Sequence, residues 1–136
     1  MVRDTEDELV RINQPEKAIP LYSTSGDWEA ILKFPHIFNT LGEWVGWVTP
    51  EQVVFDVNGV YVGYLDDEPR ILRRRSYDYQ IPRRKPPTAP ERIRPPSHVP
   101  LPPFFRELPF ESIDVFDEQP DRLHPSDMGE MREDMD

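Results

Sequence analysis

Apolar and polar residues alternate along three short blocks of the chain, and each block has a glycine near its centre. In the third block, residues 54–65, apolar positions alternate on both sides of Asn58-Gly59, a strong two-residue signal for a type I′ hairpin turn. The other two blocks are residues 21–32 and 37–48. Each block therefore predicts a β-hairpin, in which the glycine supplies the positive φ of the turn.

The three blocks are copies of one another. Their turn glycines, Gly26, Gly42 and Gly59, are 16 and 17 residues apart. An aromatic residue precedes each glycine, and a second aromatic and then a small residue follow it. The matching sets are Tyr22, Phe38 and Phe55; Trp28, Trp44 and Tyr61; and Ala30, Gly46 and Gly63. A single hairpin is marginal in water, so the copies are expected to pack together, and the small residue marks a place where another chain segment approaches closely.

A fourth copy is less complete. Residues 70–81 supply apolar positions at Ile71, Leu72, Tyr77 and Tyr79, but they contain no glycine at the turn. This segment predicts either a degenerate hairpin or a strand that caps or closes the repeat.

This pattern resembles the 4-fold β-flower proteins, a family of small bacterial proteins in which glycine-turned hairpins repeat as petals around a pseudo-four-fold axis. The resemblance covers residues 19–80 and rests on the repeated aromatic, glycine and small-residue positions. It implies an all-β fold of three to four tandem hairpins. It implies no assigned activity, so it brings no catalytic residue and no cofactor.

Composition divides the chain into four segments. Residues 1–17 predict a short helix or a disordered N-terminal segment, and residues 18–81 form the hairpin repeat domain. Residues 82–103 are a proline-rich linker, and residues 104–136 are a phenylalanine-rich acidic tail. Proline cannot donate to a sheet or helix ladder, so the linker is expected to be an extended arm of about 3.1 Å per residue. Such an arm can wrap its own domain or reach a partner.

The tail contains more aromatic residues than a solvated segment needs, at Phe104, Phe105, Phe110 and Phe116. These residues are expected either to pack on the repeat domain or to dock on another protein. Residues 111–116, which alternate in polarity, predict a strand that pairs with an exposed sheet edge in either case. The function favoured by these features is a non-catalytic interaction or scaffold module that binds a protein partner through the repeat domain and the tail.

The distribution of charge along the chain suggests an alternative function. The formal net charge is −10, which argues against a general nucleic-acid binder because phosphate neutralisation needs a basic surface. However, residues 70–85 combine tyrosines with a basic cluster, which favours a nucleic-acid-associated accessory protein or a surface that neutralises the acidic tail. The residues of this cluster are Arg73, Arg74, Arg75, Arg83, Arg84 and Lys85.

Candidate chemistry is sparse. His36, His98 and His124 lie far apart, and none has a second ligand at metal-binding spacing, so we expect no metal site, no cofactor and no enzyme activity. The sequence has no cysteine, which favours a reducing compartment and hence the cytoplasm. The acidic start of the chain predicts no export signal, and no apolar run is long enough to predict a membrane span.

Overall fold

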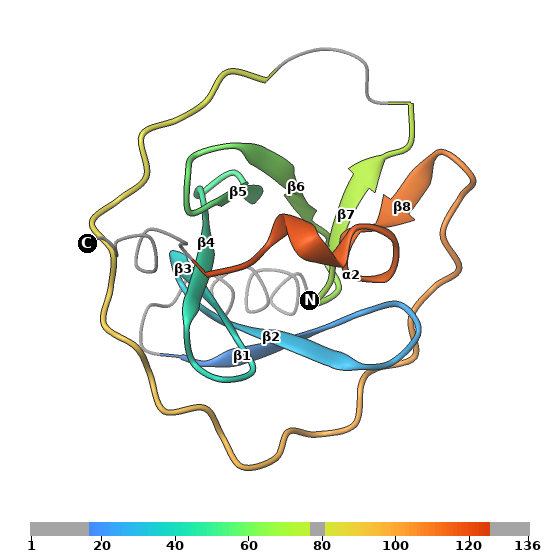
Figure 1. Cartoon of the computed structure of the whole chain (residues 1–136). Helices are drawn as coiled ribbons and strands as arrows, with labels where there is room; N and C mark the ends of the chain where they lie inside the picture. The colour runs from blue at the N-terminus through green and yellow to red at the C-terminus, as the bar shows by residue number, and fades with distance from the viewer. Residues whose placement is uncertain (1–16, 77–80, 126–136) are drawn as a thin grey trace, which may run out of the picture.

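The structure, a computed structural model, describes residues 17–76 and 81–125, and its regular secondary structure is almost entirely β (Figure 1). Within these residues, eight antiparallel strands form one curled sheet in which neighbours in sequence are neighbours in space. The strands are β1 (Ile19–Tyr22), β2 (Trp28–Lys33), β3 (His36–Asn39), β4 (Trp44–Val48), β5 (Val53–Asp56), β6 (Tyr61–Leu65), β7 (Ile71–Arg74) and β8 (Ser112–Asp114). Two short helices follow, α2 (Val115–Glu118) and η1 (Pro120–Arg122). The predicted all-β class is confirmed.

The three predicted hairpins are petals 1 to 3, formed by β1–β2, β3–β4 and β5–β6. In each petal the two repeated aromatic residues are directly opposite one another, with the register shift at the same place. The pairs are Tyr22 with Trp28, Phe38 with Trp44, and Phe55 with Tyr61. Cross-strand aromatic pairs stabilise antiparallel sheets, which explains why the aromatic positions repeat with the glycine.

The fourth hairpin is complete, but its two strands are far apart in the sequence. Strand β7 pairs with β8, so that Leu72 lies opposite Asp114 and Arg74 lies opposite Ser112. The strand predicted within residues 111–116 is therefore confirmed. In this petal 4, β7 ends at Arg74 and β8 begins at Ser112, so a long connection that includes the arm takes the place of the glycine turn of the other petals. The segment expected to be a separate tail thus contributes β8, α2 and η1 to the sheet domain.

The petal turns are fixed by a polar side chain at the last position before the turn. In petal 3, Asp56 Oδ1 accepts hydrogen bonds from the backbone N–H groups of Asn58 (2.8 Å) and Val60 (2.9 Å). Asn39 caps the turn of petal 2 in the same way, and Ser23 Oγ accepts one such bond in petal 1. Side chains of Asp, Asn and Ser commonly form such turns because they imitate a backbone carbonyl.

The type I′ turn predicted at Asn58-Gly59 is wrong. Within the described residues the only non-glycine with a positive φ is Gln52, whereas a type I′ turn needs a positive φ at both central positions. Gly59 has φ +84°, and its N–H donates to Asp56 O at 3.0 Å. The loop is therefore a three-residue hairpin connection that ends in a glycine of left-handed conformation, because the Asp56 side chain favours that geometry.

The small residue of petals 2 and 3 lies where the next petal approaches closely, as predicted. A Cβ added at Gly63 would overlap the backbone carbonyl of Leu72 in β7. A Cβ at Gly46 would lie 2.7 Å from Phe55 O in β5 and 2.8 Å from Leu123 Cδ2. These glycines therefore permit neighbouring strands to pack tightly.

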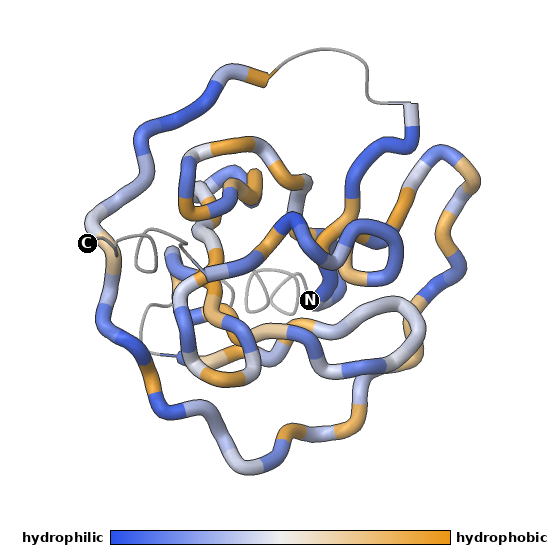
Figure 2. The backbone as a smooth tube through the Cα atoms, viewed as in Figure 1, coloured by the Kyte–Doolittle hydropathy of each residue, from blue (hydrophilic) through white to orange (hydrophobic). Residues whose placement is uncertain are grey.

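The core lies inside the curled sheet and is capped at one end by α2. Ile37, Val54 and Ile71, from three different petals, have 0% of their surface exposed. Val115 and Phe116 of α2 join this cluster from the end of petal 4. Figure 2 shows that apolar positions occur along the strands, whereas much of the surrounding arm is polar.

The proline-rich arm wraps its own domain (Figure 1). It has no helix or strand within residues 82–103, and it passes the petal tips in the order petal 3, petal 2, petal 1. The N–H of Arg84 donates to Gly59 O at 3.0 Å, and the N–H of Ile93 donates to Gly42 O at 3.0 Å. The arm is therefore a strap around the petals.

Some predictions concern residues that the structure does not describe. These residues are 1–16, 77–80 and 126–136. The possible N-terminal helix, the end of the acidic tail, and the tyrosines of the basic cluster lie outside the described residues.

Alanine substitutions at the three turn glycines are expected to distinguish the cost of backbone strain in the turn from the loss of the contact with the arm. Gly26, Gly42 and Gly59 all have a positive φ, so each substitution costs about 1 to 2 kcal/mol in the backbone alone. At Gly26 an added Cβ would lie 3.9 Å from Pro102 Cγ, which is ordinary contact. At Gly42 and Gly59 the Cβ would overlap an arm carbonyl, that of Ile93 or Arg84.

Gly42→Ala and Gly59→Ala are therefore expected to loosen the arm, whereas Gly26→Ala is not. Chemical denaturation measures the stability change, and limited trypsin digestion measures arm release through cleavage after Arg83 and Arg92. Equal cleavage rates in all three variants would show that the arm is not held at these glycines.

His36 gives a pH-dependent contribution to stability. Burial lowers the pKa of His36, whose ring lies 5.9 Å from Trp44 and 6.3 Å from Phe38. Because the unfolded chain then binds the proton more readily, stability is lost as the pH falls from about 6.5 towards the folded pKa. His36 Nδ1 has no hydrogen-bond partner among the described residues, so His36→Phe removes the titration without breaking a bond there.

The unfolding free energy of the parent is expected to fall more steeply between pH 7 and pH 5 than that of His36→Phe. Denaturant titrations of both proteins across this range measure the difference, in which the titration of every other group cancels. Parallel pH profiles would contradict the assignment.

Candidate protein-binding surface

The four phenylalanines predicted as anchors have different environments. Phe116 is 8% exposed and belongs to the core, so it is an anchor on the protein's own sheet. Phe105 is half-buried, with its ring 6.5 Å from that of Tyr22 and the guanidinium of Arg70 5.0 Å from its centre. Phe105 therefore fixes the end of the arm against petal 1.

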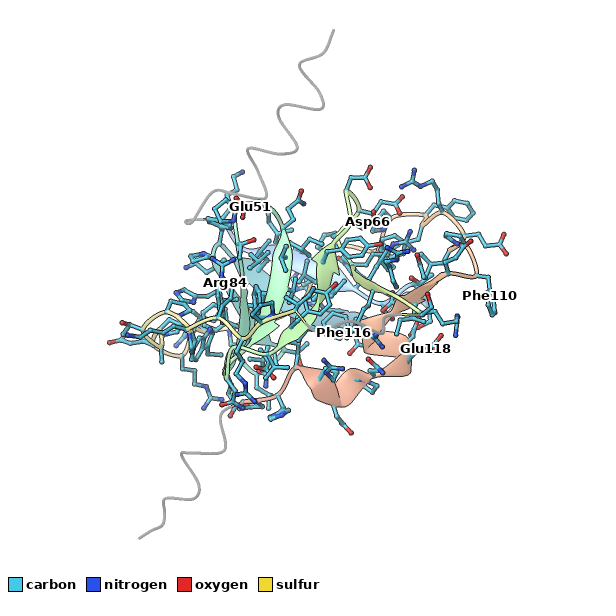
Figure 3. All side chains as sticks on the ribbon, turned by 90° about the horizontal axis from the view of Figure 1, so that it is seen from above. Glu51, Asp66, Arg84, Phe110, Phe116 and Glu118 are labelled. Atoms are coloured by element: carbon cyan, nitrogen blue, oxygen red, sulfur yellow. The ribbon has the colours of Figure 1, made fainter. Side chains whose placement is uncertain are left out.

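The other two phenylalanines face solvent. Phe104 is 100% exposed and Phe110 is 79% exposed, and Leu101 nearby in sequence is 90% exposed. We call these three residues the apolar edge. Figure 3 shows Phe110 at the periphery of the molecule and Phe116, a residue of α2, further in. Phe104 and Phe110 are thus the predicted anchors that a partner can reach, and Leu101 adds a third exposed apolar side chain.

The backbone beneath the apolar edge is held at several points. Tyr22 Oη donates to Pro100 O at 2.6 Å, and Arg70 Nη1 donates to Arg106 O at 3.2 Å. Arg75 Nε donates to Phe110 O at 2.7 Å, and its guanidinium lies 4.6 Å from the centre of the Phe110 ring. The exposed side chains therefore project from a fixed segment.

A buried carboxylate joins petal 4 to petal 1. Asp114, 3% exposed, accepts the backbone N–H of Thr24 at Oδ2 (2.7 Å) together with the Thr24 hydroxyl. Its Oδ1 accepts the N–H groups of Phe116 (3.0 Å) and Asp117 (3.3 Å), so it also caps α2. Burial raises the pKa of Asp114, although these hydrogen bonds favour the charged form. Asp114 therefore closes the curled sheet.

A buried arginine lies beside the same contact. Arg70 is 2% exposed, and its Nε donates to Asp66 Oδ2 at 3.1 Å while Nη2 lies 3.0 Å from Glu68 Oε1. Its Nη1 also donates to Thr24 Oγ1 at 3.0 Å. Arg70 and Asp114, which we call the clasp, were not predicted from the sequence as site residues. The only sequence signal for Asp114 is a carboxylate inside an otherwise apolar alternation.

Comparison with known families gives a direct result for this architecture. The family model described as 4-fold beta flower protein matches residues 4–112. The chain belongs to this family. The matched residues include petals 1 to 3, β7 and the whole arm, and the match ends at Ser112, the first residue of β8. No curated protein and no solved structure matches the chain.

The β-flower fold divides the predicted basic cluster into two groups. Arg73, Arg74 and Arg75 lie at the end of β7, where Arg73 is 8% exposed and donates to Gln119 Oε1 at 2.9 Å. The other group, Arg83, Arg84 and Lys85, lies at the tip of petal 3, where the Arg84 guanidinium is 5.6 Å from the centre of the Phe55 ring. The nucleic-acid alternative stays a prediction.

Two other kinds of site have no candidate within the described residues. No group of three or more histidine, cysteine or acidic side chains in residues 17–76 and 81–125 could hold a metal ion. None of the helices in that part of this β-flower protein is long and apolar enough to cross a membrane.

Proposed function

We propose that this β-flower protein is a non-catalytic interaction module that binds a protein partner at the apolar edge. The observation that carries the proposal is the exposure of Phe104, Phe110 and Leu101, at 100%, 79% and 90%, on one short segment. Exposed large apolar side chains on one segment favour a binding surface, and aromatic residues are common among the residues that dominate binding energy.

The fixed backbone under the apolar edge supports this function. Binding costs less conformational entropy when the contacting segment is already ordered. The hydrogen bonds of Tyr22, Arg70 and Arg75 to the carbonyls of Pro100, Arg106 and Phe110 supply that order. The sheet domain acts here as a rigid support. We also infer a cytoplasmic location, which the absence of cysteine supports.

Site-specific photocrosslinking tests the proposal. A photoreactive phenylalanine analogue is placed at Phe104, at Phe110 or at Glu51 of the full chain, in cells that naturally produce it. Glu51 is the control position because it is exposed in the loop between β4 and β5, away from Phe110 (Figure 3). The expected result is one adduct of the same partner from positions 104 and 110 and no such adduct from position 51.

A second substitution then checks the specificity of the adduct. Phe110→Ser is expected to weaken crosslinking from position 104, because the proposal has both side chains contact the same partner. An adduct that forms equally well from position 51, or no adduct from either phenylalanine, would contradict binding at the apolar edge.

A further inference from the structure

The arm contains a nine-residue repeat that matches the spacing of the petal tips. The repeat is seen in residues 83–87, Arg-Arg-Lys-Pro-Pro, and in residues 92–96, Arg-Ile-Arg-Pro-Pro. The first copy contacts the tip of petal 3 and the second contacts the tip of petal 2. The regular spacing indicates that each tip receives the same piece of extended chain.

The main chain of each copy makes the same contact. The second residue, Arg84 or Ile93, donates its N–H to the carbonyl oxygen of the turn glycine, Gly59 or Gly42, at 3.0 Å in both cases. The glycine leaves room for the carbonyl of that same arm residue, which a Cβ would overlap. Each tip is therefore shaped to receive an extended backbone.

The first residue of each copy adds a guanidinium contact. Arg83 Nη1 donates to Asn58 O at 3.4 Å, and Arg92 Nη2 donates to Leu41 O at 3.2 Å. Each acceptor is the carbonyl immediately before the turn glycine. The two prolines that end each copy keep the segment extended.

Petal 1 receives a third, altered copy. Residues 101–103 are Leu-Pro-Pro, so leucine replaces the arginine and proline replaces the N–H donor. Pro102 still lies at the tip, with its Cγ 3.9 Å from the position of a Cβ at Gly26. The chain itself thus shows that proline fits the donor position but cannot make the hydrogen bond.

The contacts that hold the arm on petals 2 and 3 are exposed and few. A hydrogen bond contributes only a small net free energy, because the same groups bond to water when they are free. One main-chain bond and one exposed guanidinium per tip, together with the contact between Arg84 and the Phe55 ring at petal 3, therefore hold the arm weakly. The arm stays in place because β7 and β8 tether its two ends, which gives it a high effective concentration. A competing segment needs only the same chemistry and a sufficient concentration.

We propose that the tips of petals 2 and 3 form a peptide-binding rim for an extended segment of a protein partner with the pattern Arg-x-(Lys or Arg)-Pro-Pro, and that the arm is its resident, displaceable occupant. The rim is separate from the apolar edge, so this inference goes beyond the proposed function. The bound arm shows which peptide chemistry fits, and the net charge of −10 favours a basic ligand.

The test uses the full chain and a synthetic peptide of residues 81–96. Arg84→Pro and Ile93→Pro together remove both arm N–H donors. The altered copy at petal 1 has a proline, Pro102, at the equivalent position. The peptide is titrated into isotope-labelled parent and double variant, and the amide resonances of Gly42 and Gly59 are followed by NMR. A control peptide carries proline at the same two positions.

The parent peptide is expected to shift both glycine resonances, with an apparent affinity at least about tenfold higher for the double variant than for the parent. The control peptide is expected to shift them little. Dispersed strand resonances confirm that the variant is folded, and Arg83→Ala with Arg92→Ala gives a second way to weaken the arm. No shift in either weakened variant, or equal shifts with both peptides, would overturn the proposal.

Discussion

Arg70→Met is expected to lower the unfolding free energy by about 3 kcal/mol. Arg70 is 2% exposed, and its guanidinium contacts the carboxylates of Asp66 and Glu68, whose side chains are 17% and 22% exposed. Methionine preserves much of the side-chain volume but leaves these two half-buried carboxylates without their cation. It also removes the donors to Thr24 and Arg106. Chemical denaturation monitored by tryptophan fluorescence measures the change.

Arg106→Ala is the matched control for this experiment. Arg106 also contacts Asp67 and Glu68, at 3.3 and 3.8 Å, but its side chain is 66% exposed. An exposed ion pair contributes at most about 1 kcal/mol, so the loss in this variant is expected to be smaller than that figure. Equal losses in the Arg70 and Arg106 variants would show that Arg70 is not a structural part of the clasp.

Asp114→Ala is expected to cost about 2 to 4 kcal/mol. The carboxylate of Asp114 accepts hydrogen bonds from the backbone of Thr24, Phe116 and Asp117 and from the Thr24 hydroxyl. Alanine removes the cap of α2 and the connection between petals 1 and 4 in one step. Denaturation gives the stability loss, and the amide resonance of Thr24 reports opening of the closure.

Asp114→Asn separates the shape of this contact from its charge. The amide keeps one oxygen to accept the N–H groups of α2, but its NH₂ group faces the Thr24 N–H and cannot accept it. Because burial raises the pKa of Asp114, the neutral amide also relieves a desolvation cost. The asparagine variant is therefore expected to lose clearly less stability than the alanine variant. The reverse order would contradict the assigned hydrogen-bonding role.

The petals could be predicted from the sequence because each is local. Residues 21–32, 37–48 and 54–65 contain both strands and the turn of a hairpin within a dozen positions, so alternation and one glycine specify the unit. The exact turn type could not be predicted from Asn58-Gly59 alone. The side chain of Asp56 accepts hydrogen bonds from two N–H groups of the turn and thereby favours a three-residue loop over a type I′ turn.

Petal 4 shows what local patterns leave open. Residues 111–116 predict a strand, but nothing in the sequence indicates that its partner is β7, which precedes the arm in the sequence. That pairing depends on a closed sheet that no single hairpin encodes. The arm itself had a usable signal, since Arg83 and Arg92 begin copies of one repeat nine residues apart.

The candidate site was predicted in part. Four phenylalanines were expected to act as anchors on the sheet or on a partner, and the structure assigns Phe116 and Phe105 to the domain itself, while Phe104 and Phe110 remain exposed. Spacing alone could not make this division, because burial depends on how residues 104–116 return to β7. The clasp residue Arg70 begins the basic segment 70–85, and nothing in that segment's sequence shows that this arginine is buried.

Residue-resolved amide hydrogen exchange of the full chain tests most directly that the arm is a strap held on the petal tips. In the arm, the N–H groups of Arg84 and Ile93 donate to Gly59 and Gly42. These two amides are expected to exchange more slowly than those of the exposed neighbours Lys85 and Arg94. Exchange of all four at the rate of an unstructured peptide would contradict the strap.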